Sequence, residues 1–202
     1  MKILVIETAT AACSVALFDG DHLLVARHEL VGRGHAERLV PMIGEVLAEA
    51  ELQRADLIQV DCGPGSFTGI RVGLAAARAL ALAWHVPVAG FSALALIAAT
   101  AGEDVGVAIS GGHGELFVQR FVRDPFAPIG ALQSLRPEDA ATTISEDLVL
   151  GSGAAALVAA RGRGRAEEIY PNAADAWMLP PALTGLPPTP VYGRAPDAKL
   201  PQ

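Results

Sequence analysis

Residues 62–84 read CGPGSFTGIRVGLAAARALALAW, in which three glycines and two hydroxyl side chains precede a long apolar run. The residues just before this stretch, LIQVD at 57–61, are apolar enough for a short β-strand. A strand, a glycine-rich turn and a helix that follow one another in this order are typical of α/β folds that hold phosphate groups at a helix N-terminus. The stretch therefore predicts a strand–turn–helix unit.

The glycine spacing does not match the common nucleotide-binding loops. GPGSFTG spaces its glycines as G-x-G-x-x-x-G, one residue longer than the dinucleotide fingerprint, and it lacks the G-K-S/T ending of a P-loop. Its amides, with Ser66 or Thr68 as N-cap, could hold an anion. The alternative is a tight strand-to-helix turn, and the sequence leaves both interpretations open.

The predicted helix is apolar almost all round. Between Ile70 and Trp84 only Arg71 and Arg78 are charged, and they lie seven residues apart on one face. Alanines and a glycine dominate the side that faces away from a sheet, and small residues allow another helix to approach closely. We expect this side to be covered by a helix of another copy, by another protein, or by a second lobe of the chain itself.

The residues before this unit predict three β-strands and a helix. KILVIE, CSVALFDG and HLLVARHEL form the strands, and Asp19-Gly20 is a hairpin signal. In HAERLVPMIGEVLAEA at 35–50 the apolar residues form one helical stripe, although Pro41 disfavours a regular first turn. With a short strand at VPVAG (86–90), the order is β-β-β-α-β-α-β. This is the order of the ribonuclease H-like fold on which actin-like ATPase domains are built.

From Ala93 onward the pattern changes. ALALIAATA at 93–101 favours a helix, VGVAIS and ELFVQRFV favour strands of a smaller lobe, and the chain is proline-rich and irregular from Pro171. We therefore expect an α/β, actin-like chain with two lobes, residues 1–101 and residues 102–202.

Composition narrows the function classes. The chain has 202 residues, of which 51% are hydrophobic and 18% charged, so it can bury a substantial core. A formal charge of −7 argues against an autonomous nucleic-acid binder. The basic stretch RGRGR at 161–165 is either a solvated loop tip or a local RNA contact. Cys13 and Cys62 have no paired metal spacing, so we expect two reduced, structural thiols.

Targeting and membrane signals are weak. No uncharged apolar run reaches about 18 residues, and Glu7 follows the first apolar residues too early for a signal peptide. We therefore expect a cytoplasmic protein that crosses no membrane.

Four segments carry a family resemblance: ILVIETATAACSVAL, HAERLVPMI, GPGSFTGIRVGLAAARALA and the terminal PVYGRAPDAK. Together they resemble the TsaB family, also called YeaZ, and GPGSFTGIRVG is the most specific of the four. The resemblance implies an actin-like subunit of the bacterial machinery that makes N6-threonylcarbamoyladenosine beside the tRNA anticodon. It also implies a heterodimer with the transferase TsaD, a ternary complex with the ATPase TsaE, a homodimer through much the same surface, and contact with tRNA only through the complex.

The resemblance places the partner surface on the two helices that start at His35 and near Thr68. The residues expected in it are His35, Leu39, Met42, Ser66, Phe67, Thr68, Arg71, Val72, Ala75, Ala76, Arg78 and Ala79. No cofactor is required by the chain itself, but the resemblance implies an ATP or ADP site at the junction with TsaD. Its expected residues are Thr8, Thr10, Gly63 and Gly65.

The catalytic residues of TsaD have no counterparts here. Where TsaD relatives carry two metal-binding histidines after the long helix, the chain has Ala93 and Ile97, which cannot bind a metal. The five histidines offer no i, i+4 pair, and His35 is expected to be a cap or surface residue. IETATAAC, which contains Glu7, also replaces the D-x-G-T phosphate motif. We expect a non-catalytic subunit without a metal; the alternative is a stand-alone enzyme, either metallopeptidase-like or an acyltransferase.

Two departures from the family pattern stand out. Ser110, Gly111 and Gly112 replace the usual Asp-Ala-Arg, and Gly193 replaces the leucine of a terminal Y-L-R. Glu115 and the arginine at 194 keep their places. Whatever the family's aspartate and arginine contact is therefore lost or changed in this chain.

Overall fold

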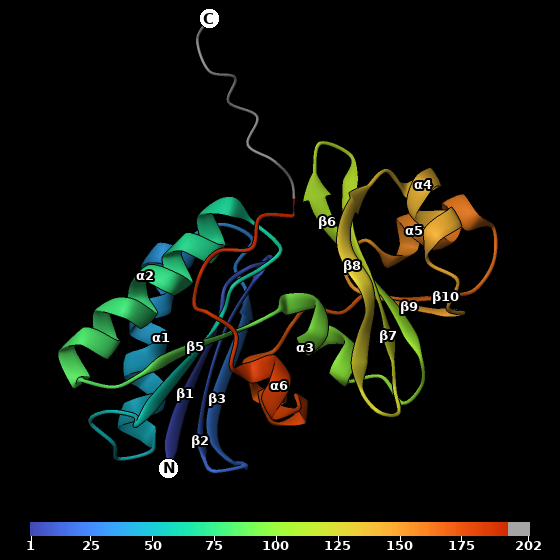
Figure 1. The fold of residues 1–202 in the computed structure, drawn as a ribbon. Helices are drawn as coiled ribbons and strands as arrows, with labels where there is room; N and C mark the ends of the chain where they lie inside the picture. The colour runs from blue at the N-terminus through green and yellow to red at the C-terminus, as the bar shows by residue number, and fades with distance from the viewer. Residues whose placement is uncertain (194–202) are drawn as a thin grey trace, which may run out of the picture.

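Two five-stranded sheets, one in each lobe, organise the chain, and the computed structural model describes residues 1–193 (Figure 1). The predicted order of the first lobe is confirmed. Its elements are β1 (Lys2–Glu7), β2 (Ala12–Asp19), β3 (His22–Leu30), α1 (His35–Glu49), β4 (Leu57–Asp61), α2 (Phe67–Trp84), β5 (Val88–Phe91) and α3 (Ala93–Ala99).

The first sheet has the strand order β3-β2-β1-β4-β5. β1, β2 and β3 pair antiparallel, and β4 and β5 continue the sheet in parallel with β1. The predicted hairpin is confirmed, since Gly20 has a φ of 59°, a conformation that glycine adopts without strain. Because β1 and β4 are parallel neighbours, their carboxyl ends, Glu7 and Asp61, meet at one edge of the sheet.

The second lobe is smaller and has the strand order β10-β9-β6-β7-β8. Its elements are β6 (Val105–Gly112), β7 (Glu115–Val122), β8 (Ala127–Leu135), α4 (Pro137–Thr143), β9 (Leu148–Leu150), α5 (Ala154–Arg161) and β10 (Arg165–Glu167). The strands predicted at VGVAIS and ELFVQRFV are therefore present as β6 and β7.

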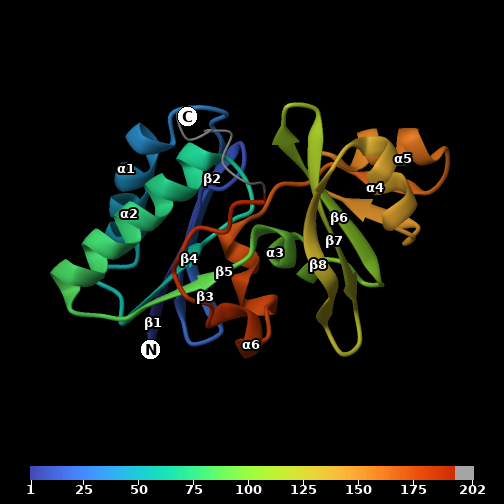
Figure 2. The same ribbon diagram turned by 45° about the horizontal axis from the view of Figure 1, so that its top comes forward.

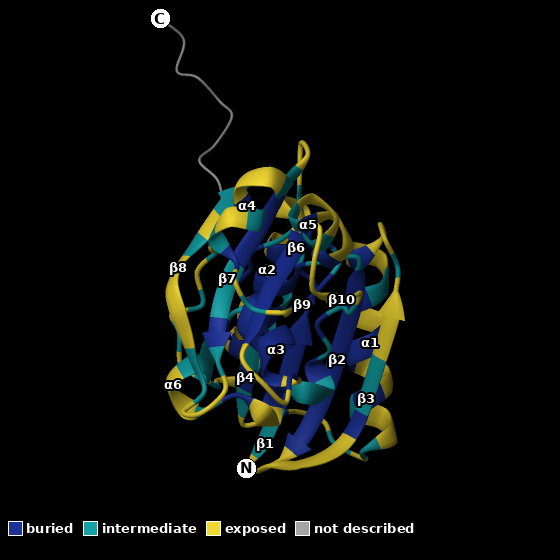
Figure 3. Ribbon diagram, turned by 90° about the vertical axis from the view of Figure 1, so that its right-hand side faces the viewer, coloured by how far each residue is buried: buried dark blue, intermediate teal, exposed yellow. Residues whose placement is uncertain are grey.

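Alternating side chains of the strands supply three cores. Leu4 and Ile6 of β1 pack under α1 and α2, whereas Val5 faces α3 and the second lobe. All seven residues of α3 are buried, because this helix lies between the two sheets. A third core joins the second sheet to α4 and α5. Figure 2 shows α1 and α2 on one side of the molecule and α4 and α5 on the other, and in Figure 3 the inner strands β2 and β6 are coloured mostly as buried.

The helix predicted at 35–50 is confirmed as α1, and the exposed Pro41 lies inside it without ending it. One expectation needs correction. The chain after residue 171 is not wholly irregular, because it forms the 3-10 helix η1 (Ala173–Met178) and the short helix α6 (Pro181–Thr184).

The C-terminal segment belongs to the first lobe, not to the second as expected for residues 102–202. The Ser14 hydroxyl on β2 donates to Asn172 Oδ1 (3.1 Å) and accepts from the backbone N–H of Ala173 (2.9 Å). From there η1 packs on β1, β2 and β3, and α6 packs on β5. The boundary near residue 101 therefore separates the two sheets, but the chain crosses back near residue 171.

Candidate functional site

The glycine loop is a close-packed turn, as the second of the two sequence interpretations predicted. Ser66 caps α2, since its hydroxyl accepts the N–H of Gly69 (3.2 Å). A Cβ at Gly65 would lie 2.0 Å from the carbonyl oxygen of Ala9, and one at Gly69 would lie 2.1 Å from that of Thr8. The glycines therefore allow the start of α2 to touch the β1–β2 turn.

Several amides around the loop are bonded inside the protein. The N–H of Ser66 donates to the carbonyl of Ala9 (2.6 Å) and that of Gly63 to Asp61 Oδ1 (2.7 Å). In the facing β1–β2 turn, the N–H of Ala9 donates to Glu7 Oε1 (2.7 Å). These three donors are not available for phosphate oxygens, so an anion at this end of α2 would have to use other amides.

Of the four residues expected at a nucleotide, two lie away from the open surface. The Thr8 side chain is buried and donates to the carbonyl of Gly69 (2.8 Å), and Gly63 is enclosed by Ile70 and Val191. Thr10 and Gly65 do line a cleft between the lobes. The assignment of Thr8 and Gly63 is corrected, and ATP or ADP binding at the junction with TsaD stays a prediction.

A first prediction concerns this turn. Gly69→Ala should lower the free energy of unfolding by about 2–3 kcal/mol, because the new methyl group overlaps the Thr8 backbone. Gly44→Ala in α1 is the matched control: a Cβ there meets no atom within 4 Å, and alanine should stabilise the helix by up to about 1 kcal/mol. Urea unfolding of both variants measures the difference, and equal stability would contradict the close contact.

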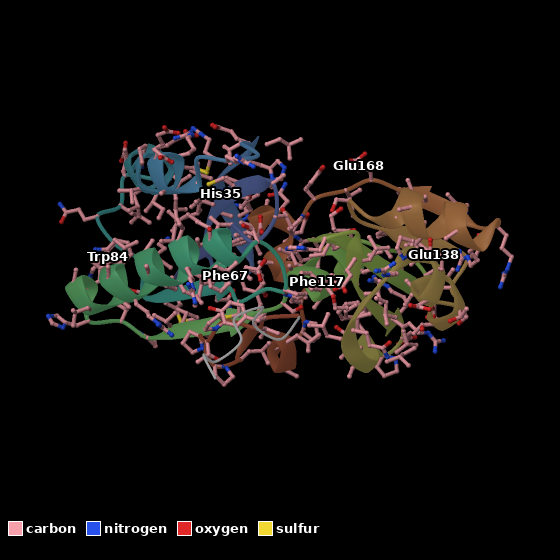
Figure 4. All side chains as sticks on the ribbon, turned by 90° about the horizontal axis from the view of Figure 1, so that it is seen from above. His35, Phe67, Trp84, Phe117, Glu138 and Glu168 are labelled. Atoms are coloured by element: carbon pink, nitrogen blue, oxygen red, sulfur yellow. The ribbon has the colours of Figure 1, made fainter. Side chains whose placement is uncertain are left out.

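The cleft between the lobes has a volume of about 870 Å³. Figure 4 shows Phe67, at the start of α2, and Phe117, on β7, on its two sides. Its lining is mostly apolar and aromatic, with hydroxyls and two basic side chains at the rim: Ala9, Thr10, Ala11, Gly65, Ser66, Phe67, Arg71, Ile109, Ser110, Gly111, Gly112, His113, Phe117, Ser152, Tyr170, Tyr192 and Gly193.

Phe117 lies against two of the glycines that depart from the family pattern. A Cβ at Gly111 would lie 3.2 Å from its ring, and one at Gly193 would lie 2.4 Å from it. Phe117 is buried in the core between the lobes and cannot easily turn away. The ring therefore fills the space that side chains at these two positions would need. The arginine at 194 lies outside the described residues.

The outward face of α2 is open. Ala75, Ala79 and Leu82 are exposed, Leu82 by 77%, so nothing in residues 1–193 covers them. Cover by the chain's own second lobe, one of the three alternatives, is therefore wrong. The helix has the length and apolarity of a membrane span, but its inner face packs into the core of the first lobe.

The residues expected on the partner surface divide by helix. Ser66, Phe67, Thr68, Arg71, Ala75, Arg78 and Ala79 are exposed, and Val72 and Ala76 are half-buried. In contrast, Leu39 and Met42 of α1 are fully buried, and His35 is buried with its Nε2 2.9 Å from the carbonyl of Ala12. His35 is thus a core residue and not a cap or surface group. The assignment of these three residues to the partner surface is corrected, because they form the core stripe of α1.

Arg71 and Arg78 hold the chain's own C-terminal segment. We call residues 186–193 the strap. Arg78 Nη2 donates to the carbonyl of Pro188 (2.7 Å), and Arg71 Nε donates to the Tyr192 hydroxyl (3.0 Å). The Arg71 guanidinium also stacks on Phe67, 3.5 Å from the ring centroid. The strap thus lies along the N-terminal part of α2 (Figure 1).

A buried acid pair, which the sequence analysis missed, lies beneath the glycine loop. Glu7 and Asp61 are almost completely buried, and among residues 1–193 neither Glu7 Oε2 nor Asp61 Oδ2 meets an ordinary hydrogen-bond donor. Burial, together with the neighbouring Asp61 charge, raises the pKa of Glu7 well above its usual value. Burial also raises the pKa of Asp61 to about 7. The pair therefore holds a proton near neutral pH.

Other candidate features are structural. Arg161 donates to the carbonyls of Ile144 and Glu146 (2.9 and 2.8 Å), and Arg165 pairs with Glu103 and Asp147, so two of the three arginines in RGRGR are engaged within the lobe. Cys13 and Cys62 are free and buried, which confirms the structural interpretation; burial raises the pKa of each thiol to about 11.

The positions that correspond to the metal ligands of TsaD relatives lie in α3. Ala93 and Ile97 are both buried in apolar cores. In the described part of the chain, residues 1–193, no three His, Cys, Asp or Glu side chains gather as a metal site would require.

Solved structures of other proteins share the fold of this chain over nearly its whole length. A solved structure described as an uncharacterized protein with similarity to peptidase YEAZ, from Pseudomonas aeruginosa, is 30% identical, with a TM-score of 0.80 over 96% of this chain and 99% of that chain. The chain belongs to the TsaB (YeaZ) family. A second structure, YeaZ from P. aeruginosa, is 27% identical with a TM-score of 0.77 over 95% and 99% of the two chains.

Sequence relatives agree with the TsaB assignment. The tRNA threonylcarbamoyladenosine biosynthesis protein TsaB of Escherichia coli K12 is 38% identical over 131 residues, which are 61% of this chain and 56% of that protein. The chain thus matches a little over half the length of this curated relative. Residues 28–126 also match the model of the family TsaD: tRNA N6-adenosine threonylcarbamoyltransferase. The actin-like, two-lobed fold expected from the strand order is confirmed for this TsaB-family chain.

Proposed function

We propose that the chain is a non-catalytic subunit that binds TsaD and activates it for N6-threonylcarbamoyladenosine modification of tRNA in the cytoplasm. The observation that carries the proposal is the open, small-residue face of α2 on a lobe whose own core is complete. The names of the TsaB relatives and the match to the TsaD family support the pathway and the kind of partner.

The face suits a helix-to-helix contact. Ala75 and Ala79 are exposed one turn apart, and small side chains let a second helix approach closely. Leu82, exposed by 77%, and Val40 of α1, exposed by 64%, add apolar area to a two-helix surface. A second copy could use the same face around a two-fold axis, so homodimer and heterodimer would compete for it. TsaE would join the heterodimer at another surface.

The absence of catalysis is supported by what occupies the equivalent positions. Ala93 and Ile97 are apolar core residues where TsaD relatives place metal-binding histidines. Glu7 is buried and bonded to the Ala9 amide, so it cannot contact a phosphate or a metal at the surface. Turnover would therefore come from TsaD.

Light scattering coupled to size exclusion tests the proposal. The chain mixed with TsaD of the same organism should elute as a heterodimer, and tRNA should be modified only when both are present with TsaE and a source of threonylcarbamoyl-adenylate. Metal-dependent hydrolysis or acyl transfer by the isolated chain, with no complex, would instead establish the stand-alone enzyme.

A further inference from the structure

The strap is fixed to the first lobe by backbone hydrogen bonds. Leu186 and Gly90 exchange two of them, at 2.6 and 3.0 Å, and the N–H of Val191 donates to the carbonyl of Cys62 (2.7 Å). Glycines make this approach possible: a Cβ at Gly90 would lie 2.9 Å from the Pro187 carbonyl oxygen, and one at Gly63 would lie 2.7 Å from that of Val191. The strap is thus built into the edge of the first sheet.

Both charged residues of α2 point to the strap. Arg78 reaches Pro188 near the middle of the strap, and Arg71 reaches Tyr192 near its end. Tyr192 also packs against Phe67, with 5.3 Å between the ring centroids. Two arginines, two turns apart on one helix face, therefore hold two points of the strap.

The far end of the strap enters the cleft and meets the second lobe. Tyr192 and Gly193 line the cleft, and Gly193 lies directly against the Phe117 ring of β7. Prolines at 187, 188 and 190 fix φ at three of the eight positions, so the segment is stiffer than an ordinary loop. Because the Val191 N–H is bonded to Cys62 between Pro188 and Gly193, a displacement at Pro188 reaches Gly193 when that hydrogen bond opens.

We propose that the strap is a mechanical link through which whatever covers the outward face of α2 sets the width of the inter-lobe cleft. Arg78 is exposed on the face that a partner would cover, so a partner that bonds to Arg78 competes with the Pro188 carbonyl. The resulting shift of the strap then reaches the Gly193–Phe117 contact between the lobes. The link goes beyond the proposed function, which assigns nothing to the cleft. It operates whether TsaD or a second copy covers the helix.

Arg78→Ala tests the link, because Arg78 holds the strap but does not line the cleft. Arg54→Ala is the matched control: Arg54 is also exposed and also donates to one backbone carbonyl, that of Trp84 at the other end of α2 (3.1 Å). Cysteines introduced at the exposed Ala48 of α1 and Ala159 of α5 carry nitroxide labels. The native thiols are buried, 0% and 1% exposed, and do not compete for the label.

Pulsed electron paramagnetic resonance then measures the distance between the lobes, and hydrogen exchange reports on the Val191 amide. We expect Arg78→Ala to raise Val191 exchange at least tenfold and to shift or broaden the distance distribution, with Arg54→Ala unchanged in both. Faster exchange with an unchanged distance would overturn the link to the cleft. Unchanged exchange would overturn the anchoring by Arg78. Tyr192→Phe, which removes only the hydroxyl that Arg71 contacts, should produce a smaller change of the same kind.

Discussion

Ala79→Arg is expected to weaken the association with TsaD by roughly 100-fold or more while leaving the chain folded. Ala79 is exposed on the outward face of α2, so the arginine meets no neighbour in the free chain. In the complex it would place an unpaired charge in an apolar contact, which costs about 3 kcal/mol. Ala79 is a better position than Ala76, because Ala76 is half-buried against the core and a large side chain there would also disturb folding.

The same substitution at Ala159 is the control. Ala159 is an exposed alanine in α5, on the far lobe, and Ala159→Arg should leave both association and folding unchanged. Titration calorimetry with TsaD and a thermal melt of each variant provide the two measurements. Undiminished binding by a folded Ala79→Arg chain would show that TsaD uses another face.

Glu7→Gln is expected to stabilise the chain at pH 8 and to flatten its stability between pH 5 and pH 8. Folding raises the pKa of Glu7 and of Asp61, so their stabilising contribution is fully present below the unfolded pKa values. It is lost as the pH rises through the folded values, that of Asp61 being about 7. Each pKa unit is worth about 1.4 kcal/mol, so the loss that accumulates between the unfolded pKa values and neutral pH is a substantial fraction of the total stability of a domain.

Glutamine keeps the shape of the side chain, removes one of the two acids and offers an N–H toward Asp61. The free energy of unfolding in urea, measured at pH 5.5 and pH 8, should therefore vary less than in the parent chain. Glu37→Gln, at an exposed position in the first turn of α1, is the control and should follow the parent curve. A parent chain as stable at pH 8 as at pH 5.5 would contradict the shared proton.

The local sequence pattern was enough to predict most helices and strands of the first lobe. The period of the α1 stripe, the glycine turn and the apolar run of α2 depend on neighbouring residues, and all three elements form where they were expected. The resemblance placed Leu39 and Met42 on the partner surface, but these residues repeat with helical period because they face the core. A partner surface on α1 would lie on the opposite, exposed face.

The remaining misses depend on contacts between distant residues. Arg71 and Arg78 were correctly placed on one face, yet their partners, Tyr192 and Pro188, come more than 100 residues later. Glu7 and Asp61 meet only because β1 and β4 are parallel neighbours. The sequence does show an acidic residue at the end of each of two apolar strands. Only the parallel pairing of β1 and β4 brings these two acids together.

The Phe117 ring occupies the space beside both Gly111 and Gly193, which affects how segments could be exchanged between relatives. A tail transplanted from a TsaB relative that ends in Y-L-R would bring a leucine to position 193, where its Cβ would lie 2.4 Å from the Phe117 ring. The ring or the strap would have to shift before such a tail could seat. Because one ring contacts both Gly111 and Gly193, substitutions at these three positions should be non-additive, and the second lobe and the C-terminal tail are best exchanged together.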